Sequence, residues 1–271
     1  MPESPRWLVM RGRHDDARVV LVRTSSTPVE ADLRLQEIKE AVEARQVGSR
    51  GGGVWKEMLI RPAKSVRRIL ICVVGLQFFQ QASGIDAIVL YGPLVFKKAG
   101  MSSNNAILGA TIAVGVVKTC FILVATLFSD RVGRRPLLLA SAMGIAVTLT
   151  SLALTLCVSV TSTLNAAACV VSVLAYVAAF SVGFGPLVPT YSSEIMPLRL
   201  RAQGTSLGTA VNRVTCALVT MTFISFADWI TMPGCFFLYA GVAAAAGAFV
   251  YVWLPETSGR SLEDMDVLFV K

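Results

Sequence analysis

Residues 77–86 read Gln77-Phe78-Phe79-Gln80-Gln81-Ala82-Ser83-Gly84-Ile85-Asp86, and this polar stretch interrupts an apolar run that begins near Ile69 and resumes at Ala87. The three glutamines and Gly84 stand at i, i+3, i+4 and i+7, so a helix places them on one face. Polar groups in a segment long enough to cross a bilayer usually face a bundle interior or a water-filled cavity. The stripe therefore predicts either a site for a neutral polyhydroxy ligand, which the whole pattern favours, or hydrogen bonds that only bridge helices.

The composition of the chain is that of a membrane protein. Its 271 residues are 54% hydrophobic and 15% charged, and the mean hydropathy of +0.64 is too high for an ordinary soluble domain. The six cysteines lie singly in apolar runs and His14 is the only histidine, so neither a disulfide framework nor a metal site is predicted. No catalytic triad or phosphate-binding loop is visible, and we expect no enzymatic activity and no cofactor.

Hydropathy and charge divide the chain into three regions. Residues 1–68 hold 14 of the 25 Lys and Arg residues, and amphipathic patterns near 15–21 and over 31–47 predict a cytosolic helical cap there. Residues 69–254 contain six apolar segments, each near or above the ~20 residues that cross a bilayer. The predicted spans are 69–96, 106–128, 137–160, 166–190, 204–226 and 234–254. Residues 255–271 form a polar cytosolic tail.

The distribution of basic residues predicts the orientation of the spans. With six spans, 21 of the 25 Lys and Arg residues fall on the side of the N-terminal region, and only Lys97 and Lys98 fall on the opposite side. The positive-inside rule then places both termini of a multi-pass protein in the cytosol, and we expect the plasma membrane. The isoelectric point of about 9.4 is thus a topology signal. No nucleic-acid partner is expected, because no basic groove with aromatic residues is visible.

Several residues inside the spans are unusual for a lipid-facing helix. The run 183–186, Gly-Phe-Gly-Pro, followed by Pro189, predicts a break in the fourth span, because proline removes a backbone hydrogen bond. Broken helices often line transporter sites. Lys118 and Arg213 lie near mid-depth at ~1.5 Å per residue, whereas Asp86, the only carboxylate well inside a span, lies nearer the outer face. Cations without partners indicate that part of the assembly is absent from this chain.

Five motifs in chain order carry a specific resemblance. They are Pro2-Glu3-Ser4-Pro5-Arg6-Trp7-Leu8, Gln80-Gln81-Ala82-Ser83-Gly84-Ile85-Asp86, Asp130-Arg131-Val132-Gly133-Arg134-Arg135-Pro136, Tyr191-Ser192-Ser193-Glu194-Ile195-Met196-Pro197 and Pro255-Glu256-Thr257-Ser258-Gly259-Arg260. The chain resembles the C-terminal half of a sugar porter of the major facilitator superfamily, and most closely the plant polyol/monosaccharide proton symporters. The resemblance covers essentially the whole chain. It implies an all-α membrane fold, the six-helix C-terminal half of a twelve-helix protein, with the end of helix six and a cytosolic helical linker in residues 1–68.

The resemblance also implies a ligand site. The family binds its hexose or polyol between two six-helix halves, and the matching positions of this chain are Gln80, Gln81, Asp86, Lys118 and Asn212. Asp86 and Lys118 both stand where the glucose facilitators carry asparagine. The tryptophan expected in the tenth helix, below the sugar, aligns with Pro189, and this departure changes the lower wall of the site.

Charged residues at the cytosolic ends of the spans acquire a role from the same resemblance. They are Asp130, Arg134, Arg135, Glu194, Arg201 and Glu256. Exposed pairs of this kind are individually worth only ~0–1 kcal/mol, but as a network we expect them to favour the outward-facing state and to break on inward opening. The alternative is that they are topogenic charges at loop ends.

Three functional interpretations remain open. In the first, which we favour, the chain is half of a transporter that moves a sugar or polyol by alternating access, with proton symport expected from the resemblance and lipid and a missing N-terminal six-helix half as partners. The family's proton-linked carboxylate belongs to the first helix, outside this chain. In the second, the chain is a truncated fragment without transport of its own. In the third, it is a homodimer or a six-helix sugar-binding or regulatory membrane protein.

Overall fold

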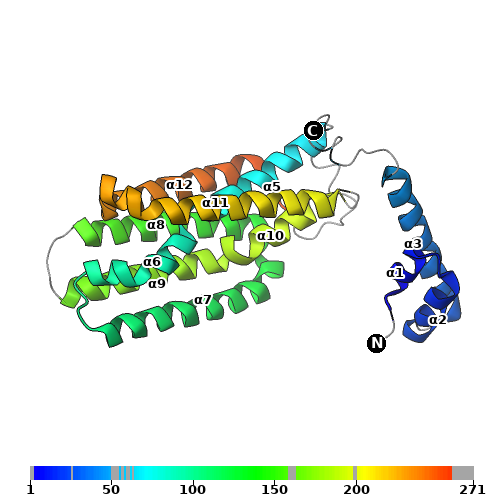
Figure 1. Cartoon of the computed structure of the whole chain (residues 1–271), viewed down its shortest axis with the longest axis horizontal. Coiled ribbons are helices and arrows are strands. Elements are labelled where there is room, and N and C mark those ends of the chain that lie inside the picture. The colour runs from blue at the N-terminus through cyan, green and yellow to red at the C-terminus, as the bar shows by residue number, and fades with distance from the viewer. Residues whose placement is uncertain are drawn as a thin grey trace. The chain divides into compact units, whose positions relative to one another are not determined.

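The structure is a computed structural model of the chain that describes residues 3–25, 27–49, 55, 58, 62, 64–157, 163–197 and 200–257. Within these ranges, only the backbone is described for residues 41–49, 130, 131 and 163. The chain divides into two compact units, Met1–Ala63 and Lys64–Lys271. The described residues form helices and their connections, with no strand among them (Figure 1).

Among the described residues of the first unit, three helices share a small apolar core. They are α1 (Pro5–Met10), α2 (His14–Thr24) and α3 (Pro28–Ser49). The core consists of the buried side chains of Leu8, Val9, Ala17, Leu21, Ala31 and Leu35. Helix α3 begins three residues before the predicted start, because proline suits the first helical position and the Thr27 hydroxyl accepts the Glu30 N–H at 3.3 Å.

A bidentate ion pair links α2 to α3. Arg18 donates from Nε to Asp32 Oδ1 at 2.6 Å and from Nη2 to Asp32 Oδ2 at 2.9 Å. This hydrogen bonding holds the pKa of Asp32 below its ordinary value. Both side chains are about half exposed, so the pair fixes the relative orientation of the two helices more than it stabilises them.

The second unit holds six helical segments that are long and apolar enough to cross a membrane, which confirms the predicted number of spans among the described residues. Its helices are α5 (Lys64–Ala82), α6 (Ile85–Lys98), α7 (Asn104–Val132), α8 (Arg134–Cys157), α9 (Thr163–Val182), α10 (Phe184–Glu194), α11 (Arg201–Ile230) and α12 (Met232–Trp253). In this bundle α8 packs against α9 and α12, α5 against α11, and α7 against α9 (Figure 1). Helices α5, α8 and α11 begin, and α10 and α12 end, at the same face of the bundle. We call this face the basic end.

Two of the six spans are broken by a glycine. The first span consists of α5 and α6, and Gly84 between them has a φ of +84°. A side chain there would also place its Cβ 2.9 Å from Tyr239 Cδ2, so the position requires glycine. The sequence pattern did not predict this break. The break predicted in the fourth span is confirmed at Gly183, between α9 and α10, where a Cβ would lie 2.4 Å from Ser141 Cβ.

Side chains of neighbouring helices satisfy backbone groups at both breaks. The Tyr176 hydroxyl donates to the carbonyl of Ser83 at 3.1 Å. Ser141 Oγ accepts the Phe184 N–H at 3.2 Å and donates to the carbonyl of Ala179 at 2.7 Å. Unpaired backbone groups cost several kcal/mol in a membrane, roughly the price of an unsatisfied polar group in hydrocarbon. These contacts therefore make the two breaks stable features of the fold.

Candidate functional site

Asn212 of α11 joins the glutamines of α5 into one buried hydrogen-bond network. Its Nδ2 donates to Gln80 Oε1 at 2.8 Å and to the backbone carbonyl of Gln77 at 3.2 Å, and its Oδ1 accepts from Gln81 Nε2 at 3.2 Å. The four residues are only 3% to 9% exposed. The structure thus brings together three of the residues that the resemblance selected, Gln80, Gln81 and Asn212. We call these three residues and Gln77, which contributes its backbone carbonyl, the amide network.

Gln80 also ties the amide network to the broken fourth span. Its Nε2 donates to the carbonyls of Phe184 at 2.6 Å and Gly185 at 3.2 Å. Pro189 stands four residues after Gly185 inside α10 and has no N–H, so the helix cannot supply the usual donor to that carbonyl. Gln80 supplies it instead. The proline that replaces the expected tryptophan therefore makes α10 depend on a side chain of α5.

One acceptor of the amide network has no partner. Gln81 Oε1 is buried and accepts no hydrogen bond from the described residues. A buried polar atom without a partner costs about 1–3 kcal/mol, so such atoms are rare and need an explanation. A hydroxyl donor that reached this oxygen would recover that free energy. A sugar or polyol carries several such donors.

Asp86 lies one turn beyond the amide network, where α6 instead of α5 contacts α11. It occupies the first turn of α6, directly after Gly84, and its Oδ2 accepts a hydrogen bond from Cys216 Sγ at 3.0 Å. Cys216 follows Asn212 by four residues and so shares its face of α11. The sequence interpretation missed Cys216, although its i+4 spacing from Asn212 was a signal that could have found it.

Three aromatic rings stack beside the break at Gly84, and the sequence interpretation missed these too. Tyr91 stacks on Phe223 with ring centroids 5.2 Å apart, and Phe223 stacks on Tyr239 at 6.3 Å. Tyr239 is the ring that packs against Gly84. Aromatic surface next to a few fixed polar groups is the usual composition of a small-molecule site.

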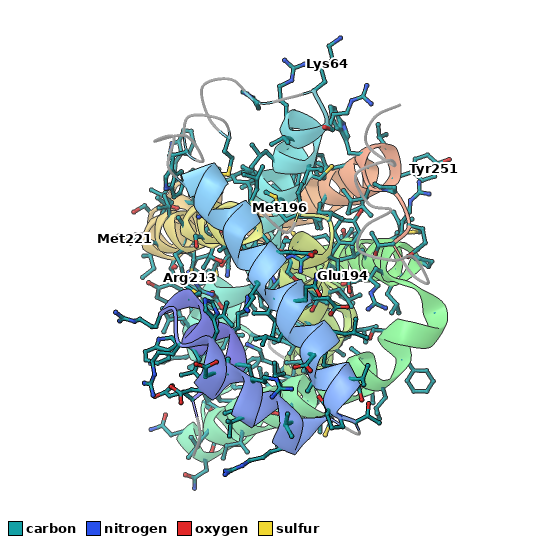
Figure 2. All side chains as sticks on the ribbon, turned by 90° about the vertical axis from the view of Figure 1, so that its right-hand side faces the viewer. Lys64, Glu194, Met196, Arg213, Met221 and Tyr251 are labelled. Carbon is teal, nitrogen blue, oxygen red and sulfur yellow. The ribbon has the colours of Figure 1, made fainter. Side chains whose placement is uncertain are left out.

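Lys118 and Arg213 occupy other places in the bundle. Lys118 is half-buried and lines a cavity of about 100 Å³ whose walls include Gly92, Pro93 and Phe96 of α6. Arg213 is exposed on the surface of α11 (Figure 2). Both residues lie in the predicted spans, but the structure places Lys118 in a cavity of its own, which the amide network does not line.

At the basic end, two of the predicted gate residues form an ion pair. Arg134 Nη2 lies 2.9 Å from Glu194 Oε1, and the side chains are 15% and 21% exposed. The Thr257 hydroxyl donates to the other oxygen of Glu194 at 3.2 Å. Glu256 has a different role, because its carboxylate accepts the backbone N–H groups of Arg134 at 3.0 Å and Arg135 at 3.1 Å. It therefore caps the N-terminus of α8, where a negative charge is favourable.

The remaining predicted gate residues hold backbone carbonyls or are not described. Arg135 Nη2 donates to the carbonyl of Tyr251 at 2.7 Å, and its guanidinium lies 5.6 Å from the centroid of that ring. Arg201 donates to the carbonyl of Met196 at 3.4 Å. The side chain of Asp130 lies outside the described residues. Hydrogen bonds to the backbone thus accompany ion pairing at the basic end.

Comparison with known sequences identifies the family. The chain matches the family model described as sugar (and other) transporter over residues 1–269. It is 51% identical to Polyol transporter 5 of Arabidopsis thaliana over 99% of this chain and 53% of that relative. It is 34% identical to the Facilitated trehalose transporter Tret1 of Aedes aegypti over 98% of this chain and 33% of that relative.

Solved structures with the same fold agree with this family. The major facilitator proton:xylose symporter XylE, bound to 6-bromo-6-deoxy-D-glucose, matches with a TM-score of 0.75 and 28% identity over 99% of this chain and 55% of that chain. The inward-open xylose transporter XylE from E. coli matches with a TM-score of 0.70 and 27% identity over 99% and 52%. The chain spans about half the length of the curated polyol transporters that it matches. It belongs to the sugar transporter family, and its six spans have the fold of one half of a major facilitator protein.

Proposed function

We propose that the six spans form one wall of a sugar or polyol site in a transporter that works by alternating access. The observation that carries this proposal is the buried, unpartnered Oε1 of Gln81 within the amide network. It is an acceptor fixed beside other amides at the broken helices, where transporter sites are commonly built. Relatives described as polyol, trehalose and xylose transporters support the same class of substrate.

Five residues are proposed to hydrogen-bond the ligand. They are Gln80, Gln81, Asp86, Asn212 and Lys118. The first four belong to two successive turns of contact between α5/α6 and α11. Lys118 lines a separate cavity beside α6. It is assigned to the ligand from the family resemblance, and because a half-buried ammonium inside a span needs a polar partner.

A second six-helix unit is proposed to supply the opposite wall. In the second span, Asn104–Ser129, only 11% of the apolar part is buried. In the fifth span, Arg201–Ile230, the buried share of the apolar part is only 22%. Such a unit would cover part of these helices. We propose proton symport, in line with the description of XylE as a proton:xylose symporter. The excess of basic residues supports a cytosolic basic end. We also propose a plasma-membrane location and a gate that includes the ion pair of Arg134 and Glu194.

Tracer uptake in transporter-deficient yeast tests the proposal. The chain is co-expressed with the N-terminal six-helix half of Arabidopsis Polyol transporter 5, and uptake of labelled polyols and hexoses is measured. We expect uptake from the pair, and at least a ten-fold loss with Gln81→Ala or Asn212→Ala, the ratio for about 1.4 kcal/mol. Asn105→Ala is the matched control, because this exposed amide lies at the start of α7.

Two results would contradict the proposal. Full uptake by the Gln81→Ala or Asn212→Ala chain, each co-expressed with the N-terminal half, would show that the amide network does not bind the substrate. The chain expressed alone is expected to give no uptake. Uptake by the chain alone at the rate of the pair would show that a second copy of this chain, and not a different six-helix unit, supplies the opposite wall.

A further inference from the structure

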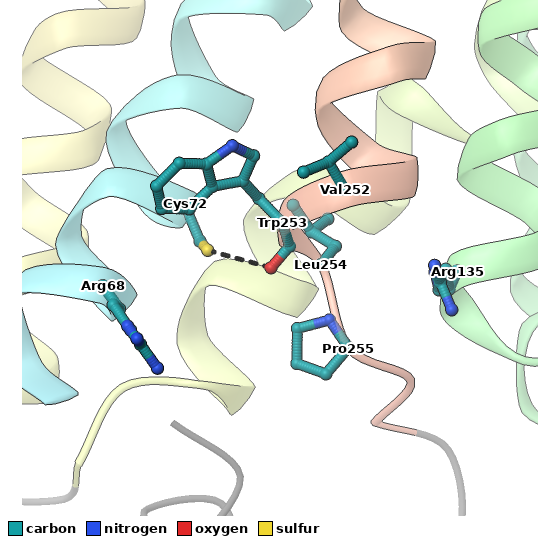
Figure 3. Close-up of a pocket in the computed structure, with 7 residues that line it drawn as sticks. All are labelled: Arg68, Cys72, Arg135, Val252, Trp253, Leu254 and Pro255. Carbon is teal, nitrogen blue, oxygen red and sulfur yellow. Dashed lines mark hydrogen bonds between the residues drawn. The ribbon is translucent and has the colours of Figure 1, made fainter. Parts of the chain in front are cut away.

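Another cavity, of about 500 Å³, opens at the basic end between α5, α8 and α12. Its lining residues are Arg68, Cys72, Arg135, Val252, Trp253, Leu254 and Pro255. Figure 3 shows Arg68 and Arg135 on opposite sides of the cavity, with Trp253 and Pro255 between them. None of these seven residues belongs to the amide network, so the cavity needs its own explanation.

The charge of this cavity is positive. Two of its seven lining residues are arginines and none of the seven is acidic. Arg135 uses one N–H on the carbonyl of Tyr251, whereas its Nε is buried and finds no acceptor among the described residues. A guanidinium has five N–H donors, so Arg135 retains donors for an anion. The nearby carboxylate of Glu256 accepts the first N–H groups of α8.

The depth of the cavity is that of the lipid headgroups. Trp253 is 43% exposed in the last turn of α12, and its neighbours Tyr251 and Val252 are 67% and 73% exposed. Exposed tryptophan and tyrosine at the end of a span mark the membrane–water interface. Cys72 Sγ donates to the carbonyl of Trp253 at 3.5 Å, which holds this turn against α5. The arginines thus lie beside an aromatic and apolar wall at the membrane surface.

We propose that this cavity binds the headgroup of an anionic phospholipid. Basic pockets between spans at one membrane face bind such headgroups, and guanidinium groups match phosphate and carboxylate oxygens geometrically. Phosphatidylserine carries one phosphate and one carboxylate, so each group meets one of the two arginines on opposite sides of the cavity. A lipid bound there joins the ends of the first, third and sixth spans. This site does not depend on the proposed sugar site.

Native mass spectrometry of the full chain, released from detergent, tests the site. Dioctanoyl phosphatidylserine is titrated against dioctanoyl phosphatidylcholine, which has the phosphate but no net charge, and against inorganic phosphate. We expect retention of phosphatidylserine alone. Arg68→Gln and Arg135→Gln are each expected to weaken it about five-fold, the ratio for ~1 kcal/mol per basic side chain near an anionic headgroup. Arg67→Gln is the matched control, because Arg67 is exposed at the adjacent position but does not line the cavity.

Several outcomes would overturn the proposal. Equal retention of the two lipids, or an equal loss with Arg67→Gln, would show unspecific attraction. Displacement of the lipid by inorganic phosphate at the same concentration would assign the site to a soluble anion. Binding seen only after deletion of residues 258–271 would assign the cavity to that acidic segment. Because Arg135→Gln also removes a bond to α12, the exposed Arg68 decides the result if the Arg135 variant does not fold.

Discussion

The hydrogen bond from Gln80 to Gly185 predicts that Gln80 and Pro189 are energetically coupled, although one lies in α5 and the other in α10. Gln80→Met keeps the length of the side chain and removes its donors. Pro189→Ala restores an N–H four residues after Gly185. In the parent chain Gln80→Met leaves the Gly185 carbonyl without a donor, whereas in the Pro189→Ala background the helix itself supplies one.

The magnitude follows from the bonds that are lost. Gln80→Met removes two donated hydrogen bonds and one accepted from Asn212. At an average of ~0.6 kcal/mol each in a membrane protein, they sum to about 2 kcal/mol. The unpaired carbonyl of Gly185 adds about 1 kcal/mol at the lower end of the cost for a buried polar group. We therefore expect losses of about 3 kcal/mol in the parent and about 2 kcal/mol in Pro189→Ala, a coupling of about 1 kcal/mol.

Reversible unfolding of the full chain in mixed detergent micelles, followed by circular dichroism, measures the free energies of unfolding of the parent, the two single variants and the double variant. The control cycle pairs Gln80→Met with Pro93→Ala, because Pro93 is also a proline inside a helix, α6, and no hydrogen bond connects it to Gln80 among the described residues. This control is expected to be additive. Additivity of the Gln80 and Pro189 variants within ~0.3–0.5 kcal/mol would refute the reasoning.

Three further predictions concern separate parts of the chain. Cys216→Ala is expected to weaken ligand binding about three- to five-fold, because Asp86 loses a hydrogen bond of roughly 0.6–1 kcal/mol. Cys216→Ser keeps a donor, so equal losses of affinity in the two variants, measured in a binding titration, would contradict this prediction. Glu194→Gln is expected to shift the paired protein towards inward opening by about 1 kcal/mol, measured as faster labelling of cysteine probes at the cytosolic side; unchanged labelling would speak against a gate. The lowered pKa of Asp32 predicts that its stabilising effect is complete above the ordinary carboxyl pKa and disappears only as the pH falls through the lower folded-state value. Hydrogen exchange in α2 and α3 measures this effect. Arg18→Gln should abolish the difference between the folded-state and unfolded-state pKa values of Asp32. An acid profile of the variant identical to that of the parent would contradict this prediction.

Local patterns were sufficient to predict the spans and one of the two breaks. Hydropathy over some twenty residues predicts a membrane helix, and the prolines after Gly183 predict a break because they remove backbone donors. The i, i+3, i+4 spacing placed the glutamines of α5 on one face, and all three are buried. The break at Gly84 depends on Tyr239, which packs on it from α12, and no local pattern contains that contact.

The contacts of the candidate site were less predictable, because they join distant parts of the chain. Asn212 entered through the family resemblance, and its bonds to Gln80 and Gln81 cross from α11 to α5. Cys216 was overlooked because a cysteine in an apolar run attracts no attention by its residue type, so that only its four-residue spacing from Asn212 pointed to the site. Counting residues gave the depth of Lys118, but depth is a coordinate along the helix axis. The direction in which the Lys118 side chain leaves the helix places it in a separate cavity. That direction depends on how α6 and α7 pack, which residue counting does not give.

The cap that Glu256 provides for α8 also constrains the biosynthesis of the protein. The carboxylate and the N–H of Arg134 are separated by 122 residues. At a synthesis rate of roughly 5–20 residues per second, that distance corresponds to about 6–24 seconds of translation. During this interval α8, α9, α10, α11 and α12 leave the ribosome while the start of α8 still lacks its cap. The contact of Thr257 with Glu194 has to wait for the same moment. These contacts of the basic end therefore form only after residues 256 and 257 have been made, and a chain that stops shortly before residue 256 lacks the cap of α8.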